Sequence, residues 1–313
     1  MRIGAEQCII HHMKKHGLRS TLLPVFTALI WGTAFVAQDV CAEDVPPMAF
    51  NAIRFFIAVL FLAAVKLVIG LFKKKKAPSA EERPSVKKLI LAGALCGAAL
   101  CVASNLQQAG MHWGTEAGKS GFITALYVVL VPIGGLLLKR RIRPIFWFAV
   151  ALAVAGLYLL CLHGSFKFAP GDLLTLLCAA AFTVQILLID RFAGELDPIL
   201  FCIAEFLTAA ILSAVGMLVF EKPETAPILA HALPILYVAI FSCGVAYLLQ
   251  IIAQRDGDPT VVSILFSLEA VFSVIASAII LHQRMTAREY AGCALLFAAV
   301  LIAQLPGKKV ENR

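Results

Sequence analysis

The sequence predicts an all-α, polytopic membrane protein whose ten transmembrane helices form two inverted repeats of five. The first observation is composition: 61% of the 313 residues are hydrophobic and 15% are charged, against about 45–50% and about 25% in soluble domains. The second is that apolar runs recur along the whole chain, which has a mean hydropathy of +0.89. The third is that the two halves of the chain resemble each other segment by segment.

The apolar runs have the length that a membrane span requires. A bilayer core about 30 Å thick is crossed by about 20 helical residues. The runs are separated mostly by short loops, so no soluble domain is expected between them. In chain order, the predicted spans are residues 20–40, 47–70, 88–109, 116–138, 144–162, 171–190, 197–220, 232–253, 259–281 and 288–305.

Prolines mark the beginnings of several spans. Pro47, Pro198 and Pro259 each stand at the start of a predicted helix, where a missing N–H costs little. Pro132 lies instead inside the span 116–138, where proline frees a carbonyl and distorts the helix. We therefore expect a kink in that span, which serves either as a hinge or as a fixed bend.

The positive charges are distributed unequally between the two sides of the predicted membrane. With loops assigned alternately from a cytoplasmic N-terminus, 20 Lys and Arg residues fall on one side and 5 on the other. Positive charge is retained in the cytoplasm during insertion, so both termini are expected inside the cell, in the plasma membrane. The net charge of +8 therefore indicates topology and no nucleic-acid partner. The run at 73–76 is a topological anchor, or alternatively a contact for anionic lipid.

The two halves of the chain align without a missing span. Each predicted helix of the first half finds a counterpart, in the same order, in the second half. The matching pairs are LKRRIRPIFW with LHQRMTAREY and Gln107 with Gln250 at an offset of 143 residues, AFVAQ ending at Gln38 with AFTVQ ending at Gln185 at 147, and PMAFNAIRF with PILFCIAEF at 151.

An odd number of spans per repeat forces the second repeat to enter the membrane in the opposite sense. Inverted repeats around a site near the midplane are the architecture of secondary transporters. The predicted organisation is a lead of residues 1–19, a first repeat of 20–162, a second repeat of 171–305 and a tail of 306–313. The lead and the tail are expected in the cytoplasm.

Three segments carry a resemblance to a known family. TEAGKSGFITALYVVLVPIGGLLL, ALIWGTAFVAQ and the pattern SLEAVFSVIASAIIL followed by YAGCALLFAAVLI resemble the EamA branch of the drug/metabolite transporter superfamily. The resemblance extends from about residue 20 to 305. It implies ten helices, two inverted repeats, and export or exchange of small metabolites. The chain departs from the family pattern at Gln283, where many relatives have an acid, and at Ala270, where proline is common.

The segment GTEAGKSGF ends like a phosphate-binding P-loop, but its spacing is one residue too short. The first glycine of the G-x-x-x-x-G-K-[ST] pattern would fall at Trp113, and a long apolar run follows. We therefore expect no nucleotide, no other cofactor and no metal. The segment is predicted to be an outer loop and the first turn of a helix. Lys119 would then lie at the membrane interface, or would attract anionic substrates.

Three charged residues lie deep inside predicted spans, where a charge costs at least about 2.5–3.5 kcal/mol and usually has a role. Arg54 and Glu205 are each seven residues from the proline that starts their span, and Glu269 is ten residues from its own. Arg54 is the candidate partner of a substrate carboxylate, or of Glu269 when the site is empty. Glu269 and Glu205 are candidate coupling charges, since a carboxyl that changes protonation between conformations couples transport to protons.

Uncharged polar and aromatic residues on several spans favour a partly hydrated central cavity. Each of them could instead make a helix-to-helix hydrogen bond or pack at a helix contact. The candidate substrate-binding residues are Arg54, Trp31, Gln38, Asn105, Gln108, Tyr127, Gln185, Tyr247 and Gln250.

The favoured function is a secondary active transporter, an exporter or exchanger, of small metabolites such as amino acids or related compounds. The alternative is a polytopic membrane enzyme acting on a lipid-linked substrate, although the sequence contains no H-E-x-x-H motif and we expect no catalysis. A channel is disfavoured, because the repeats lie within one chain. The expected partners are a small-molecule substrate and membrane lipid, with the choice between monomer and homodimer left open.

Overall fold

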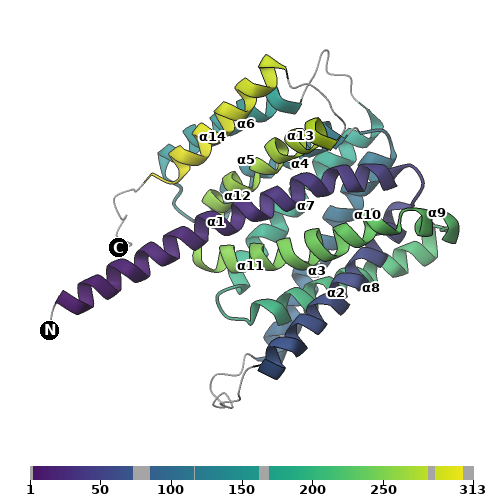
Figure 1. Cartoon of the computed structure of the whole chain (residues 1–313), viewed down its shortest axis with the longest axis horizontal. Helices are drawn as coiled ribbons and strands as arrows, with labels where there is room; N and C mark the ends of the chain where they lie inside the picture. The colour runs from purple at the N-terminus through teal and green to yellow at the C-terminus, as the bar shows by residue number, and fades with distance from the viewer. Residues whose placement is uncertain (1–2, 73–84, 116, 162–168, 281–285, 306–313) are drawn as a thin grey trace.

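The structure is a computed structural model that describes residues 3–72, 85–115, 117–161, 169–280 and 286–305. These residues form helices joined by short connections, and none of them lies in a strand (Figure 1). The all-α prediction is confirmed. In chain order, the elements are α1 (Ile3–Ala42), α2 (Pro47–Phe72), α3 (Val86–His112), α4 (Ala117–Thr124), α5 (Tyr127–Leu137), α6 (Pro144–Cys161), α7 (Pro170–Phe192), α8 (Pro198–Phe220), α9 (Thr225–Ala230), α10 (Ala232–Tyr237), the π-helical segment η2 (Val238–Ala246), α11 (Tyr247–Asp256), α12 (Pro259–Phe266), α13 (Leu268–Ile280) and α14 (Ala287–Ala303).

Eight helical segments within the described part of the chain are long and apolar enough to cross a membrane. The predicted span 144–162 falls on a shorter apolar helix, Pro144–Leu160. The predicted span 288–305 falls on α14, which has 17 residues. The total of ten spans therefore stays a prediction. The eight segments are Thr21–Ala42, Pro47–Phe72, Val86–His112, Lys119–Leu137, Pro170–Phe192, Pro198–Phe220, Ala232–Arg255 and Pro259–Ala276.

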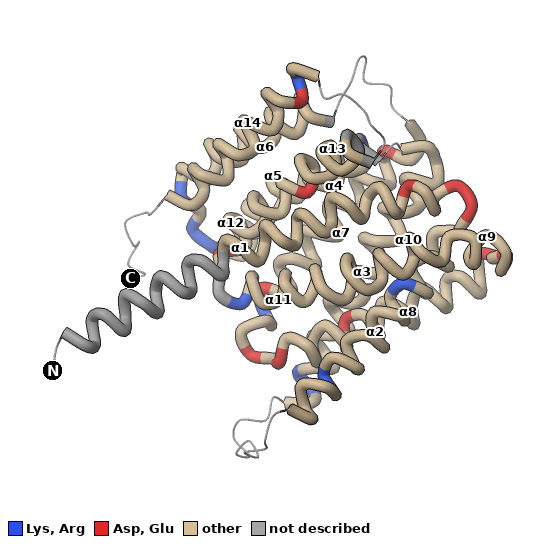
Figure 2. The backbone as a smooth tube through the Cα atoms, viewed as in Figure 1, with Lys and Arg blue, Asp and Glu red and all other residues tan. Residues whose placement is uncertain are grey.

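The helices lie side by side in one bundle (Figure 1). The pair α6 and α14 forms one edge, the pair α2 and α8 forms the opposite edge, and α1 runs between them against α13 and α11. Lys, Arg, Asp and Glu gather mainly near the helix ends, while the middles of the helices are largely uncharged (Figure 2). Large apolar side chains such as Leu67 and Leu218 are exposed on the outside of the bundle, as a lipid environment permits.

The helices α2 and α8 run antiparallel and are tied together at both ends. At one end, the Glu221 carboxylate accepts the N–H groups of Met48 and Ala49 at 2.8 Å each. At the other, Lys66 pairs with Asp197 at 2.8 Å, and Asp197 caps the start of α8. Burial raises the pKa of Asp197, but the Lys66 ammonium and the α8 amides outweigh burial and lower it overall. The two helices that carry Arg54 and Glu205 are thereby held in fixed register.

Two predicted spans are interrupted, and the interruptions fall at nearly corresponding positions of the two halves. Residues 125–126 separate α4 from α5, and residue 267 separates α12 from α13. The repeat offset of 143 residues maps the last residue of α4, at position 124, onto 267, so the two breaks are one residue out of register. The Ser267 hydroxyl donates to the Ile264 carbonyl at 2.7 Å, and such local bonds compete with the helix ladder. Pro132 lies within α5, so the break precedes the position where a kink was expected.

The predicted span 232–253 is also irregular. It is built from α10, the wide turns of η2 and α11 in sequence. π-Helical turns leave carbonyls without their usual partners and are frequent at functional sites. In η2, the Ser242 carbonyl accepts the Trp31 indole N–H at 3.4 Å, so this irregular segment receives a side chain from α1.

Two glycines allow helices to cross closely at the backbone of Glu269 and of Glu205. A Cβ added at Gly32 on α1 would lie 2.6 Å from the Glu269 carbonyl oxygen on α13. A Cβ at Gly97 on α3 would collide with the Glu205 carbonyl oxygen on α8. Small residues at such crossings let the backbones approach closely. The backbone positions of Glu269 and Glu205 therefore depend on the absence of a side chain on the facing helix.

Replacing Gly32 by alanine is expected to destabilise the protein by about 1–3 kcal/mol, because the added methyl group forces α1 away from α13. The measurement is the unfolding temperature in detergent. Gly70→Ala is the matched control, since Gly70 also lies in a helix and a Cβ there meets nothing within 4 Å. Equal unfolding temperatures for the two variants would contradict the close crossing.

Candidate functional site

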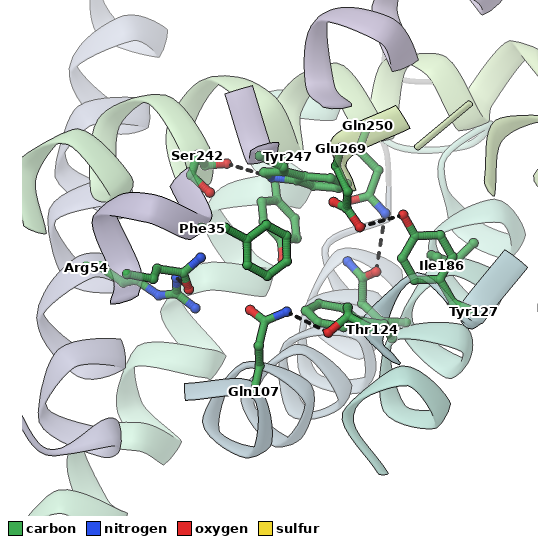
Figure 3. A pocket seen from close by; sticks show the side chains of 14 residues that line it. Phe35, Arg54, Gln107, Thr124, Tyr127, Ile186, Ser242, Tyr247, Gln250 and Glu269 are labelled. Atoms are coloured by element: carbon green, nitrogen blue, oxygen red, sulfur yellow. Dashed lines mark hydrogen bonds between the residues drawn. The ribbon is translucent and has the colours of Figure 1, made fainter. Parts of the chain in front are cut away.

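A cavity with about 520 Å³ of empty volume lies inside the helix bundle (Figure 3). Side chains from α1, α2, α3, α4, α5, α7, η2, α11 and α13 meet around it. The lining residues are Trp31, Phe35, Gln38, Arg54, Gln107, Thr124, Tyr127, Phe182, Gln185, Ile186, Ser242, Tyr247, Gln250 and Glu269.

Most of the residues that the sequence singled out meet in this cavity. Three of them do not line it: Asn105, Gln108 and Glu205. In the view of Figure 3, Arg54 lies on one side of the cavity and Glu269 on the other, with the Phe35 ring between them. The predicted residues that line it are Arg54, Trp31, Gln38, Tyr127, Gln185, Tyr247, Gln250 and Glu269.

Arg54 is a buried cation without a carboxylate partner among the described residues. Only 4% of the residue is exposed. Its guanidinium donates to Gln38 Oε1 at 2.8 Å and lies over the rings of Phe50 and Phe55, 5.1 and 4.9 Å from their centroids. Its Nε has no hydrogen-bond partner. Ring faces and one amide compensate a buried charge only in part, so Arg54 retains the capacity to bind an anion.

Glu269 stands at the start of α13, two residues beyond the interruption at position 267. The Tyr127 hydroxyl donates to its Oε1 at 2.9 Å, and the residue is 3% exposed. The first turn of a helix favours a carboxylate, because unpaired N–H groups point toward it. The helix break thus places a carboxyl group on the cavity wall, with one phenol as its hydrogen-bond partner.

A chain of side-chain amides connects the cavity with Glu205. Gln250 donates to Gln185 at 3.3 Å and to Gln254 at 3.0 Å. Gln185 in turn donates to Glu205 Oε1 at 2.8 Å. Glu205 is fully buried, and its Oε2 has no hydrogen-bond partner. Because Gln185 lines the cavity and donates directly to Glu205, only the Gln185 side chain separates Glu205 from the cavity.

The pairs Gln38–Arg54 and Gln185–Glu205 correspond in the two halves of the sequence. Gln38 aligns with Gln185 at an offset of 147 residues, and Arg54 aligns with Glu205 at 151. In the first half, the amide oxygen accepts from the guanidinium. In the second half, the amide nitrogen donates to the carboxylate. An amide can present either atom, so one residue type serves charges of opposite sign.

The aromatic candidates pack against each other as well as lining the cavity. Trp31 makes edge-to-face contacts with Tyr247 and Phe266, with ring centroids 5.0 and 5.1 Å apart. Tyr247 also contacts Phe206 at 5.3 Å. Edge-to-face pairs stabilise such clusters. Trp31 and Tyr247 therefore present aromatic surface to the cavity, with Phe206 and Phe266 packed behind them.

Polar residues outside the cavity join helices to one another. Asn105 donates to the Cys101 carbonyl and to Ser213, and Gln108 donates to the Gln38 carbonyl. Lys119 forms an ion pair with Asp172, which is 1% exposed and also accepts the Thr115 hydroxyl. These contacts link α3 to α8, α3 to α1, and α4 to α7, and the side chains that make them do not line the cavity.

Six lining residues were not among the sequence candidates. The repeat contained a signal for three of them: Gln107 aligns with a candidate, and Phe35 and Phe182 occupy the same position of the AFVAQ and AFTVQ segments. No sequence pattern indicated the other three: Thr124 reaches the cavity at the helix break and Ser242 from η2, whereas Ile186 reaches it from the continuous helix α7. The six are Phe35, Gln107, Thr124, Phe182, Ile186 and Ser242.

The chain matches the sequence model of the EamA-like transporter family at residues 19–162 and again at residues 169–304. It is 30% identical over 281 residues to an uncharacterized transporter of Archaeoglobus fulgidus, covering 89% of this chain and 83% of that protein. It is 22% identical to the uncharacterized inner membrane transporter YedA of Escherichia coli K12, covering 91% and 92% of the two chains.

Two further similarities extend over almost the whole chain. The aromatic amino acid exporter YddG of Ancylobacter novellus is 26% identical, with 93% of this chain and 98% of that protein covered. A crystal structure that is 22% identical superposes with a TM-score of 0.74 and covers 94% of this chain and 99% of that chain. Together with the apolar helices, the named relatives indicate a multi-pass membrane protein.

A double-mutant cycle tests the contact between Gln38 and Arg54. With Gln38→Leu, Arg54→Leu and the double variant, the expected coupling is about 1.5–3 kcal/mol, because the hydrogen bond involves a charged group. Unfolding in detergent measures it. The control combines Asp197→Ala with Arg54→Leu. Asp197 pairs with Lys66, which lies twelve residues after Arg54 on α2, so the effects of these two substitutions should be additive. A coupling near zero for the first pair would contradict the contact.

Proposed function

Because the chain belongs to the EamA-like transporter family, we propose that it is a secondary active transporter that exports or exchanges small metabolites by alternating access. Its substrates are amino acids or related compounds, and it has no catalytic activity. One observation supports this most directly: the cavity inside the bundle contains Arg54, a buried cation that has no carboxylate partner among the described residues.

The chemistry of the lining supports a substrate with a carboxylate and an apolar side chain. Arg54 offers guanidinium N–H groups in the planar arrangement that matches a carboxylate. Trp31, Phe35 and Phe182 supply aromatic surface to the same cavity. The relative YddG is named as an aromatic amino acid exporter, and a substrate of that kind would satisfy both parts of this lining.

The proposed architecture is ten spans in two inverted repeats, with both termini in the cytoplasm. The two matched ranges of the family model and the two interruptions at nearly corresponding positions support it. Discontinuous helices in matching places of two halves surround the site in many transporters. Alternating access then exchanges the conformations of the two halves around the cavity.

Solute counterflow in proteoliposomes tests the substrate class. We expect unlabelled phenylalanine inside the vesicles to drive uptake of labelled phenylalanine, while phenethylamine, which lacks the carboxylate, drives little. Arg54→Gln should lower kcat/KM for phenylalanine at least about tenfold, as the loss of a charge-assisted hydrogen bond implies. Arg54→Lys keeps the charge but loses the planar fork, so its loss should be smaller but still measurable.

Lys66→Gln is the matched control for these variants, since it removes a positive charge from the same helix at the Asp197 pair, away from the cavity. Equal transport by wild type and Arg54→Gln would contradict carboxylate binding by Arg54. Absence of counterflow for every amino acid tested would contradict the substrate class.

Glu269 is proposed to couple transport to protons. It is buried in this conformation with one phenol as partner, and hydration in another conformation would let it exchange a proton. Glu269→Gln is expected to abolish flux driven by a pH gradient while exchange at equal pH survives. Tyr127→Phe, which keeps the carboxyl group, should retain the coupling. Unchanged pH dependence in Glu269→Gln would refute the role.

A further inference from the structure

The two corresponding charges, Arg54 and Glu205, are placed differently with respect to the cavity. Arg54 lines the cavity, whereas Glu205 does not. Glu205 is nevertheless only one hydrogen bond away from it, because its partner Gln185 is a lining residue. Its second carboxylate oxygen is buried and has no hydrogen-bond partner. No cation lies within ion-pairing distance of Glu205 among the described residues.

Keeping the Glu205 carboxylate in this buried environment throughout the transport cycle would cost free energy. A buried carboxylate with one amide partner and one unpaired oxygen is far less stable than a solvated or ion-paired one. A membrane-embedded acid in such a position usually has a function. Packing does not require an acid here, because Phe206 on the same helix packs against Phe55 of α2 with ring centroids 5.5 Å apart, and Phe201 lies in the same apolar core.

Six of the other lining residues form three symmetric pairs. Phe35 and Phe182, Gln38 and Gln185, and Gln107 and Gln250 are pairs that align in the two halves, and both members of each pair line the cavity. When two inverted halves exchange conformations, each residue takes the place of its counterpart. Both members of the aromatic and amide pairs therefore line the cavity in either conformation. A lining residue whose counterpart lies outside the cavity leaves the lining in the other conformation, and the counterpart takes its place.

We infer that Glu205 is a second charged residue of the substrate cavity, which lines it in the opposite conformation of the transport cycle while Arg54 withdraws behind Gln38. The inference rests on the alternating-access function proposed above. The cavity would then present a cation in one conformation and a carboxylate in the other, with the same two glutamine pairs and one phenylalanine pair around both.

The exchange gives the two conformations unequal affinity for a substrate carboxylate. Arg54 attracts the carboxylate in the conformation of this structure, and Glu205 repels it in the other. The exchange supplies no driving force for net transport. A difference in affinity between the two conformations only shifts how often each is populated. It does favour release of the substrate on one side of the membrane. Glu205 is thus a specificity-determining residue for substrate release.

Thiol accessibility tests the exchange whichever substrate the protein carries. In a variant with all nine cysteines replaced, Arg54→Cys and Glu205→Cys are introduced singly, and a membrane-impermeant thiol reagent is applied from each side of proteoliposomes. We expect Arg54→Cys to react from one compartment and Glu205→Cys from the opposite one. Gln38→Cys should react from both sides. Leu62→Cys, fully buried on α2 and absent from the cavity lining, should react from neither.

Any other pattern of labelling at positions 54 and 205 overturns the inference. If Arg54→Cys reacts from one side while Glu205→Cys reacts from neither, or from the same side, the inference is overturned and the transporter proposal stands. If Arg54→Cys and Gln38→Cys react from neither side, no conformation opens the cavity to water, and the transporter proposal itself fails.

A second variant tests the electrostatic consequence. The variant is Glu205→Gln, and KM for phenylalanine is measured separately from each side of the membrane. We expect KM to fall at least about fivefold on the side from which the thiol reagent labels Glu205→Cys, and to stay unchanged on the other side. Glu205→Asp should restore the wild-type difference between the sides. Equal changes on both sides would indicate a purely structural role and overturn the inference.

Discussion

The bilayer provides no water to solvate a charge, and this constraint determines how the bundle is organised. Every charged group inside it must obtain its partners from the protein. Arg54 obtains Gln38 and two ring faces, Glu269 obtains Tyr127, and Glu205 obtains Gln185. Each of these three charges has an uncharged partner, and none of the three is neutralised by an ion pair among the described residues. The helices are thus built around polar groups that only partly satisfy one another.

The same constraint explains where the helices are irregular. Unpaired backbone groups are tolerated at membrane depth only where protein or a cavity covers them. The break after Thr124 lies between the lining residues Thr124 and Tyr127, the break at Ser267 lies two residues before Glu269, and η2 contributes Ser242 to the cavity lining. The close crossing at Gly32 fixes the backbone of α13 just after its break. Irregular backbone, close packing and polar lining therefore occur at one place.

Composition and length sufficed to predict the helical class and the position of most spans, because long apolar runs have no other stable arrangement. The internal repeat went further, since it aligned Gln38 with Gln185 and Arg54 with Glu205 from the residues alone. Sequence could not separate Asn105, which joins α3 to α8, from Gln107, which lines the cavity. The two are close neighbours on one helix, and their roles depend on which helix packs against each face. The helix breaks were equally unpredictable, because hydropathy does not register local hydroxyl-to-carbonyl bonds such as that of Ser267.

Some aligned positions of the two halves keep the same residue and others differ in charge, and this difference follows from the chemistry of the side chains. An amide can donate or accept and a ring face tolerates many contacts, so glutamine and phenylalanine can line a cavity in either arrangement of two duplicated halves. A charge cannot adapt in this way, because its sign is fixed. Duplicated positions that must serve both arrangements are therefore expected to retain the adaptable residues, while a position that serves one arrangement is free to diverge in charge. The identical Gln38 and Gln185 beside the opposite charges Arg54 and Glu205 fit that rule.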